Sequence, residues 1–272
     1  MAVSLSNIAR GVLIKPPKVV IYGVGGVGKT SWAAGAPNPI FLFCEEGQGM
    51  LGVERFEPRP RDPVLRSYVE VYEALTALRN EPHDFGTVVL DTLDAFEPFL
   101  WQHTAAKWHK ETIEDFGYGK GYGYAVDEAN ILLQWLDALR NERNMAIVLI
   151  SHCETVKFED PESASYDRYD LRLHKRLAAT VDHWADCVLF ANYRQHVVRD
   201  DEGFNRERAR AVGVGERVLY TERRPTFRAK NRYGLPPEIP LSWQAFQDGI
   251  VVPTTPQPEP QPQPKTKTKK ES

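Results

Sequence analysis

The stretch that most constrains the fold of this chain is "KVVIYGVGGVGKTSWAAG", residues 18–35. The β-branched run at 18–23 predicts a buried strand, and the residues from Lys29 onward predict a short helix that ends at Gly35 and Pro37. Between them, residues 23–30 match the pattern G-x-x-x-x-G-K-[ST] at every position. Glycines in such a loop let backbone amides wrap around phosphate groups, and the pattern therefore predicts a nucleotide site.

The side chains of this loop predict how ATP and Mg²⁺ are held. Lys29 is expected to reach the β- and γ-phosphates, and the Thr30 hydroxyl is expected to ligate Mg²⁺. The residues expected to bind the nucleotide are Gly23, Val24, Gly25, Gly26, Val27, Gly28, Lys29, Thr30 and Ser31. ATP and Mg²⁺ are thus the predicted cofactors.

Apolar runs of strand length alternate with segments of helical periodicity in the rest of the chain. Further strands are predicted in "PIFLFCEE", "FGTVVLDTLDAF", "MAIVLISH" and "DCVLFANY". Helices are predicted at 67–79, where Ser67 is a suitable N-cap, and at 127–141. Strands that alternate with helices form βαβ units, so the expected fold is α/β, with a mostly parallel sheet and helices on both of its faces.

Composition and cysteine usage limit the class of protein. The 272 residues are 42% hydrophobic and 26% charged, which is typical of a globular protein. No apolar run approaches the roughly 18 residues of a membrane helix, and the N-terminus lacks the pattern of a signal peptide. Three cysteines that are far apart in sequence argue against a disulfide framework or a zinc site and for a cytoplasmic location. With a net charge of −3, any contact with nucleic acid must come from local basic patches.

Two regions are expected along the chain. Residues 1–252 are predicted to form one ATPase core. Residues 253–272, "PTTPQPEPQPQPKTKTKKES", contain proline, glutamine and lysine and offer no apolar anchor. Such a segment cannot bury enough surface to offset the entropy lost on ordering, and we expect a disordered tail.

Acidic and histidine side chains follow the predicted strands. Asp91 ends the strand "TVVLD" and is a candidate to hold Mg²⁺ through water, although a carboxylate there could also cap the next helix. Glu45 and Glu46 end the preceding strand and are candidates to polarise the attacking water. His152 ends a later strand, and the sequence leaves open whether it senses the γ-phosphate or only caps the sheet.

The order of these parts resembles the RecA/RadA/DnaB class of ATPase cores. That class places its catalytic glutamate on the strand after the phosphate-loop helix, here "FLFCEEG", and the resemblance leaves both Glu45 and Glu46 as candidates. Thr92 stands after Asp91 where other P-loop families usually carry glutamate, which argues against a standard AAA+ enzyme. "LISHCE" looks like the sensor strand of the RecA-like class, with His152 at the sensor position.

A narrower resemblance is to compact phage nucleotide-binding proteins. It is carried by "GKTSWAAGAPNPIFLFCEEG", "GYGKGYGYAV" and "DHWADCVLFANY" together and covers about residues 15–250. These proteins are reduced RecA-like cores, and some are linked to single-strand annealing and recombination.

The segment "KNRYG", residues 230–234, resembles the KNRFG motif of RadA. In such ring or filament ATPases, a lysine and an arginine of one subunit reach the γ-phosphate held by its neighbour. The resemblance implies that Lys230 and Arg232 act in trans and that the protein is a homo-oligomer. The alternative is an exposed basic turn.

Two segments occupy the positions of DNA-contacting loops in RecA-like cores. "FGYGKGYGY", residues 116–124, is expected to be a flexible loop in which aromatic rings stack on bases and a lysine contacts phosphate. Residues 153–177 are expected to be a connection that is mobile in its middle and basic at its end. The alternatives are a loop packed on its own core and a solvated connection. The residues predicted to bind DNA are Tyr118, Lys120, Tyr122, Tyr124, Arg172 and Lys175.

The leading hypothesis is an ATPase that assembles on single-stranded DNA and promotes annealing or strand exchange in phage-type recombination. A helicase-like or helicase-loading ATPase is one alternative. A nucleotide-dependent scaffold that binds a protein and no DNA is another, and a small-molecule kinase is disfavoured because the chain has no recognisable lid. A single-strand-binding or replication protein is a candidate partner, and no membrane is expected.

Overall fold

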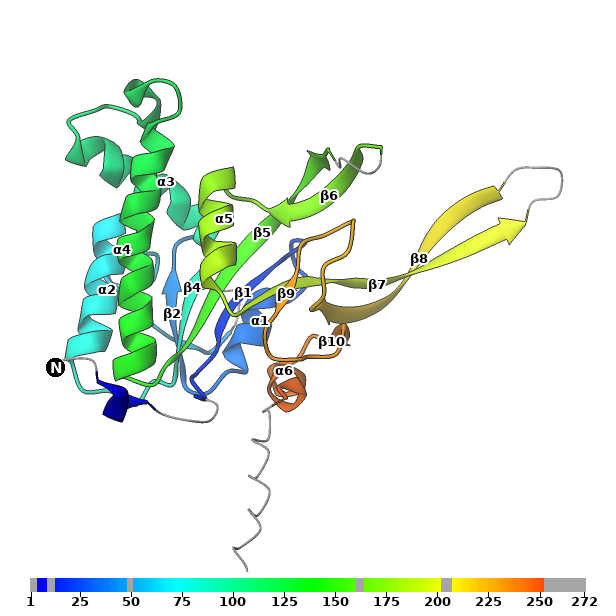
Figure 1. The fold of residues 1–272 in the computed structure, drawn as a ribbon, viewed down its shortest axis with the longest axis horizontal. Coiled ribbons are helices and arrows are strands. Elements are labelled where there is room, and N and C mark those ends of the chain that lie inside the picture. The colour runs from blue at the N-terminus through cyan, green and yellow to red at the C-terminus, as the bar shows by residue number, and fades with distance from the viewer. Residues whose placement is uncertain (1–3, 9–12, 48–50, 160–163, 202–206, 252–272) are drawn as a thin grey trace, which may run out of the picture. The chain divides into compact units, whose positions relative to one another are not determined.

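The computed structural model describes residues 4–8, 13–47, 51–159, 164–201 and 207–251 (Figure 1). The tail predicted at 253–272 lies outside these residues. Residues 15–251 form one compact unit. A short 3-10 helix, η1 (Leu5–Asn7), belongs to the other unit, which comprises residues 1–14 and 252–272.

A mostly parallel sheet forms the centre of the 15–251 unit. Its strands lie in the order β10-β8-β7-β1-β5-β4-β2-β3. The strands with parallel neighbours are β1 (Lys18–Gly23), β2 (Pro39–Phe43), β3 (Glu54–Arg55), β4 (Thr87–Asp91), β5 (Ala146–Phe158) and β7 (Cys187–Asp201). Antiparallel pairing adds β6 (Tyr166–Leu171), β8 (Glu207–Tyr220), β9 (Lys230–Asn231) and β10 (Glu238–Pro240).

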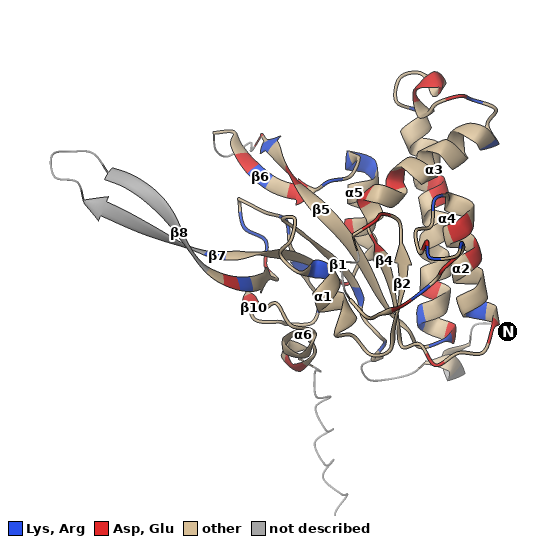
Figure 2. Cartoon of the chain, turned by 180° about the vertical axis from the view of Figure 1, so that it is seen from behind, with Lys and Arg blue, Asp and Glu red and all other residues tan. Residues whose placement is uncertain are grey.

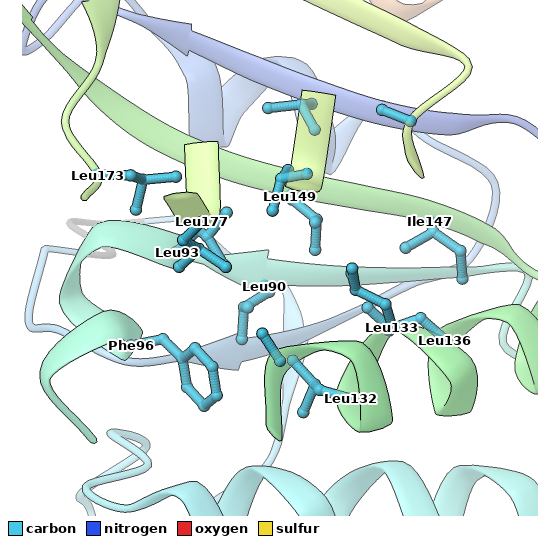
Figure 3. Packing of buried hydrophobic residues seen from close by; sticks show 14 of the residues in the cluster. Leu90, Leu93, Phe96, Leu132, Leu133, Leu136, Ile147, Leu149, Leu173 and Leu177 are labelled. Carbon is cyan, nitrogen blue, oxygen red and sulfur yellow. The ribbon is translucent and has the colours of Figure 1, made fainter. Parts of the chain in front are cut away.

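Helices cover both faces of this sheet, so the expected α/β class is confirmed. On one face lie α2 (Tyr68–Asn80), α3 (Leu93–Lys107), α4 (Gly121–Glu142) and α5 (Lys175–Trp184). Figure 3 shows this packing, with Leu132, Leu133 and Leu136 of α4 facing Leu90 and Ile147 of the sheet. The other face carries α1 (Lys29–Ala34) and α6 (Trp243–Gly249), whose Trp32 and Trp243 rings lie 4.8 Å apart. Among the described residues, every helix is too short or too polar to span a bilayer.

The register of the parallel strands brings several strand ends to one edge. Gly23 at the end of β1 lies opposite His152 of β5 and Ala191 of β7. Asp91 at the end of β4 lies opposite Ile150 of β5. A Cβ on Gly23 would lie 2.0 Å from the Ala191 carbonyl oxygen, so a side chain there would force β7 away from β1. The loop after β1 therefore meets the ends of β2 and β4 at the carboxyl edge of the sheet, where α/β proteins bind ligands.

The segment expected to be a loop at 116–124 is more ordered than predicted. A 3-10 helix, η2, spans Ile113–Phe116, and α4 begins at Gly121 rather than near Asp127. A Cβ on Gly121 would lie 2.2 Å from the Ile113 carbonyl oxygen, so this glycine permits the close contact between η2 and α4. Tertiary packing thus overrides the low helix propensity of the glycines, from which a flexible loop was expected.

The connection expected at 153–177 also differs from the prediction. β5 continues through Cys153 to Phe158 and pairs with β6 in antiparallel register, from Cys153 opposite Leu171 to Phe158 opposite Tyr166. Asp170, one of the acidic residues that suggested a mobile connection, is instead buried and forms ion pairs with Arg168 and Arg228. Residues 160–163, in the middle of the expected connection, lie outside the described residues. Residues 153–158 and 166–171 are therefore strands of a hairpin, and α5 begins at Lys175.

Candidate nucleotide-binding site

The glycine-rich loop after β1 closes around Lys29. Lys29 Nζ donates hydrogen bonds to the carbonyl oxygens of Gly23, at 3.0 Å, and Val24, at 3.1 Å. Gly28 has a φ of 107°, a conformation that favours glycine, and it turns the chain into α1. Lys29 is only 6% exposed, and burial lowers the pKa of its ammonium group. A buried cation that has only carbonyl partners is stabilised by an anion, and phosphate fits that requirement.

Thr30 and Asp91 form the candidate metal position. Thr30 Oγ1 donates to Asp91 Oδ2 at 2.8 Å, which joins the first turn of α1 to the end of β4. Burial raises the pKa of Asp91 to about 6. Among the described residues no cluster of three or more His, Cys, Asp or Glu side chains is placed to hold a metal by itself. This pair fits Mg²⁺, which keeps several waters and takes phosphate oxygens beside one or two protein ligands.

A cavity of about 550 Å³ opens beside the loop, a volume that suits a small ligand. Its lining includes most residues that the sequence predicted for catalysis and for nucleotide binding: Gly26, Gly28, Lys29, Thr30, Ser31, Glu45, Glu46, Asp91 and His152. Glu45 Oε1 lies 3.9 Å from His152 Nδ1, whereas Glu46 is more exposed than Glu45. The two glutamates that the sequence left equivalent are therefore placed differently.

Asp94 is a residue of this site that sequence reasoning missed. Its carboxylate, with the side chain 2% exposed, accepts hydrogen bonds from the His152 backbone amide at 2.9 Å and from His152 Nδ1 at 3.0 Å. Arg172 Nε lies 3.3 Å from the same carboxylate. The hydrogen bond to Asp94 raises the pKa of His152. Burial alone would raise the pKa of Asp94, but the two His152 bonds and Arg172 lower it.

Glu97 lies one turn farther along α3 and was also missed. Both of its carboxylate oxygens accept from the His174 backbone amide at 3.0 Å, and burial raises its pKa to about 7. The available signal was the spacing of Asp94 and Glu97, which places two acidic residues on one face at the start of a helix. Leu93, Phe96 and Leu100 make this stretch otherwise apolar and buried.

The residues predicted to bind DNA fall at the beginnings of α4 and α5, which contact each other. The Tyr122 ring stacks on the His174 ring, with centroids 4.0 Å apart and planes at 10°. This contact places the segment of Tyr118 and Lys120 beside that of Arg172 and Lys175. In Figure 2, basic residues colour the start of α5 and acidic residues colour parts of nearby α3.

The side chains predicted to bind DNA differ in how exposed they are. Tyr118 is fully exposed, and Lys175 and Arg172 are exposed. Tyr122 is held by His174, and Tyr124 packs against Trp108, with ring centroids 4.9 Å apart. The half-exposed Trp108 is a further aromatic side chain at this surface that the sequence analysis did not consider.

Lys230 and Arg232 lie away from the cavity, near the amino end of the sheet. Lys230 pairs with Val188 of β7, and Lys230 Nζ donates to the carbonyl oxygens of Asp182 and His183 at the end of α5. Arg232 Nη1 is 3.6 Å from Asp186, whose amide donates to the Lys18 carbonyl oxygen at the start of β1. The structure thus separates these two residues from the other catalytic candidates of the same chain.

The arrangement of a glycine-rich loop, its lysine and the Thr30–Asp91 pair agrees with a family comparison. The model of a family described as an AAA domain, AAA_24, matches residues 15–233. The chain belongs to this AAA domain family. The match confirms the P-loop ATPase class expected from the sequence.

Two further comparisons are more distant. The SPbeta prophage-derived uncharacterized protein YorG of Bacillus subtilis (strain 168) is 25% identical over 195 residues, which are 68% of this chain and 53% of YorG. The chain spans about half the length of that relative, whose prophage origin agrees with the resemblance to phage proteins. A solved structure of the RadB recombinase is 12% identical, with a TM-score of 0.43, and the match covers 85% of this chain and 90% of that one.

The raised pKa of Asp91 gives a stability prediction. A carboxyl with a pKa of about 6 in the folded state, against 3.8 for an ordinary aspartate side chain, stabilises the fold when protonated and loses that contribution as pH rises through about 6. We expect Asp91→Asn to raise the free energy of unfolding of the nucleotide-free protein at pH 8 by roughly 1–3 kcal/mol, and to change it little at pH 4. Urea unfolding at both pH values measures this. The exposed Glu73→Gln is the control, and a less stable Asp91→Asn protein at pH 8 would contradict the prediction.

Proposed function

We propose that this chain hydrolyses ATP and acts on single-stranded DNA as an oligomer, in phage-type recombination. The observation that carries the proposal is the convergence of Lys29, the Thr30–Asp91 pair, Glu45 and His152 on one cavity at the carboxyl edge of the sheet. Lys29 and the loop amides hold the phosphates in this proposal. Thr30 and Asp91 hold Mg²⁺, which when bound neutralises charge on the β- and γ-phosphate oxygens.

Glu45 is the better placed of the two candidates to polarise water. It lines the cavity within 3.9 Å of His152 Nδ1, and its charge acts on both Lys29 and Asp91. His152 Nδ1 forms the hydrogen bond to Asp94. The other ring nitrogen, Nε2, takes no part in that bond. We propose that His152 contacts the γ-phosphate and that Asp94 fixes the orientation of its ring.

The distance between Arg232 and the cavity supports action in trans. β1 has six residues, and at a rise of about 3.3 Å per residue its two ends lie roughly 17 Å apart. Arg232 is near the first end and the phosphate loop follows the second. An arginine side chain cannot bridge this separation within one subunit while it contacts Asp186. If Arg232 stabilises charge on a γ-phosphate, the nucleotide must belong to a second copy, and the site is complete only in an oligomer.

The contact between α4 and α5 supports a nucleic-acid surface. The Tyr122–His174 stack joins two segments that the sequence predicted separately. One segment carries the exposed Tyr118 and Lys120, and the other carries the exposed Arg172 and Lys175. Exposed aromatic rings beside cations bind single strands without reading their sequence. Binding to a single-strand-binding or replication protein and a cytoplasmic location stay predictions.

The two glutamates give a matched pair of variants. We expect Glu45→Gln to keep ATP binding and to lower turnover by about 10²–10⁴-fold, because the neutral amide cannot accept a proton from water. Glu46→Gln should stay within about threefold of the wild type, because that side chain is more exposed. Steady-state phosphate release and ATP-analogue binding measure the two effects. Loss of turnover in Glu46→Gln alone would reverse the assignment.

ATP turnover in the presence of single-stranded DNA tests the proposed function as a whole. We expect DNA to increase the rate, and the rate to rise more steeply than linearly with protein concentration, because the site needs a second copy. Lys29→Ala should abolish turnover under all conditions and serves as the control. Tyr118→Ala should weaken DNA binding by about 1–3 kcal/mol and leave DNA-free turnover unchanged. A rate indifferent to DNA and to concentration would instead favour a nucleotide-dependent protein scaffold.

Mixing two inactive variants tests the trans role of Arg232. A Lys29→Ala subunit retains Arg232, and an Arg232→Ala subunit retains the phosphate loop. We expect each variant alone to be inactive and an equal mixture to recover activity, because roughly a quarter of randomly formed interfaces then carry both groups. A double variant that carries both Lys29→Ala and Arg232→Ala is the control. Its mixture with the Arg232→Ala variant should recover no activity, because neither subunit supplies Arg232. Absence of recovery at every mixing ratio of the single variants would contradict the trans role.

A further inference from the structure

The flank of the phosphate loop that faces β7 and β8 carries a guanidinium group that the proposed mechanism does not use. Arg217 of β8 places Nη1 3.5 Å from the Val27 carbonyl oxygen, and a Cβ on Gly28 would lie 2.9 Å from the same nitrogen. Arg217 is exposed, and among the described residues no carboxylate lies within ion-pair distance of it. Arg194 on the neighbouring strand differs from Arg217 in this respect, because Glu216 and Glu238 both bind it.

An aromatic and an aliphatic side chain accompany Arg217. Tyr193 of β7 lies directly opposite Arg217 in the antiparallel register, so the two side chains share one face of the sheet. Tyr193 is 37% exposed. It lies about 7 Å beyond Ala191, the partner of Gly23, and therefore stands alongside the loop. Leu241 completes the group, since its Cδ2 would lie 3.5 Å from a Cβ on Gly28.

The order of the strands determines which part of a nucleotide meets this group. Asp91, proposed for Mg²⁺, and His152, proposed for the γ-phosphate, stand on β4 and β5, on one side of β1. β7 and β8 stand on the other side. A nucleotide whose terminal phosphate points toward β4 and β5 must direct its ribose and base away from them, toward β7 and β8.

We infer that Arg217 and Tyr193 form the subsite for the nucleobase and ribose of the bound nucleotide. The inference rests on the proposed nucleotide site and adds the residues that recognise its organic end. A planar guanidinium group and an aromatic ring both stack on a base, and Leu241 offers an apolar wall. Lys29 and the loop amides bind the phosphates, whereas Arg217 and Tyr193 bind the base and ribose. A ligand that has phosphates and no base therefore tests the two groups of contacts separately.

The test compares a nucleotide with a ligand that has the same phosphates and no base. Binding of ADP, of a non-hydrolysable ATP analogue and of inorganic tripolyphosphate, each with Mg²⁺, is measured by calorimetry on the full-length chain. We expect Arg217→Ala to raise the Kd of both nucleotides by about tenfold and to leave the Kd of tripolyphosphate within twofold of the wild type. Tyr193→Ala should act in the same direction. Arg194→Ala, a change to a nearby paired arginine, should alter none of the three.

The outcomes separate this inference from the proposed function. Equal weakening of nucleotides and tripolyphosphate by Arg217→Ala would overturn the inference, because Arg217 would then act on the phosphates or on the shape of the loop. Unchanged binding of all ligands in both Arg217→Ala and Tyr193→Ala would also overturn it. A wild-type protein that binds neither nucleotide nor tripolyphosphate would instead contradict the nucleotide site itself. Arg217→Lys should not restore nucleotide binding, since lysine keeps the charge and loses the plane.

Discussion

The buried ammonium group of Lys29 is the interaction on which the site depends. Its hydrogen bonds to the carbonyl oxygens of Gly23 and Val24 draw the loop around the side chain. Carbonyl oxygens carry only partial charge and do not neutralise the cation. The positive φ of Gly28 lets the loop turn directly into α1, whose first residue is Lys29 itself. One lysine thus sets both the shape of the loop and its preference for an anion.

The sheet places the chemical groups around that lysine. β5 lies between β1 and β4, so His152 stands beside Gly23, while Asp91 reaches the loop through the Thr30 hydroxyl. Beneath them, Asp94 binds both the backbone and the ring of His152. The position of His152 is therefore fixed from two sides, by the register of β5 and by a buried carboxylate on α3. Such double support holds the His152 ring in one orientation, which the proposed contact with the γ-phosphate requires.

The sequence predicted those parts of the site that lie in one continuous segment or at the end of an apolar strand. The loop, Asp91 and His152 belong to this kind, because local pattern alone shows where a parallel strand ends. Asp94, Arg217 and Tyr193 could not be predicted in the same way, since their roles come from contacts with residues far away in sequence. The helical start of α4 was missed for a related reason. Gly121 and Gly123 suggest a loop, and only the close approach of η2 shows why glycine is needed in that helix.

Charge balance in the cavity connects nucleotide binding to assembly. Glu45, Glu46 and Asp91 line the cavity with Lys29 and His152, and Asp94 already binds Arg172 and the histidine. A bound triphosphate adds more negative charge at the end where these carboxylates gather. Mg²⁺ offsets part of it, and Arg217 stands on the opposite flank of the loop. On the proposed mechanism a single subunit holds the nucleotide, and Arg232 of a second copy adds a further cation for the charge that develops on the γ-phosphate.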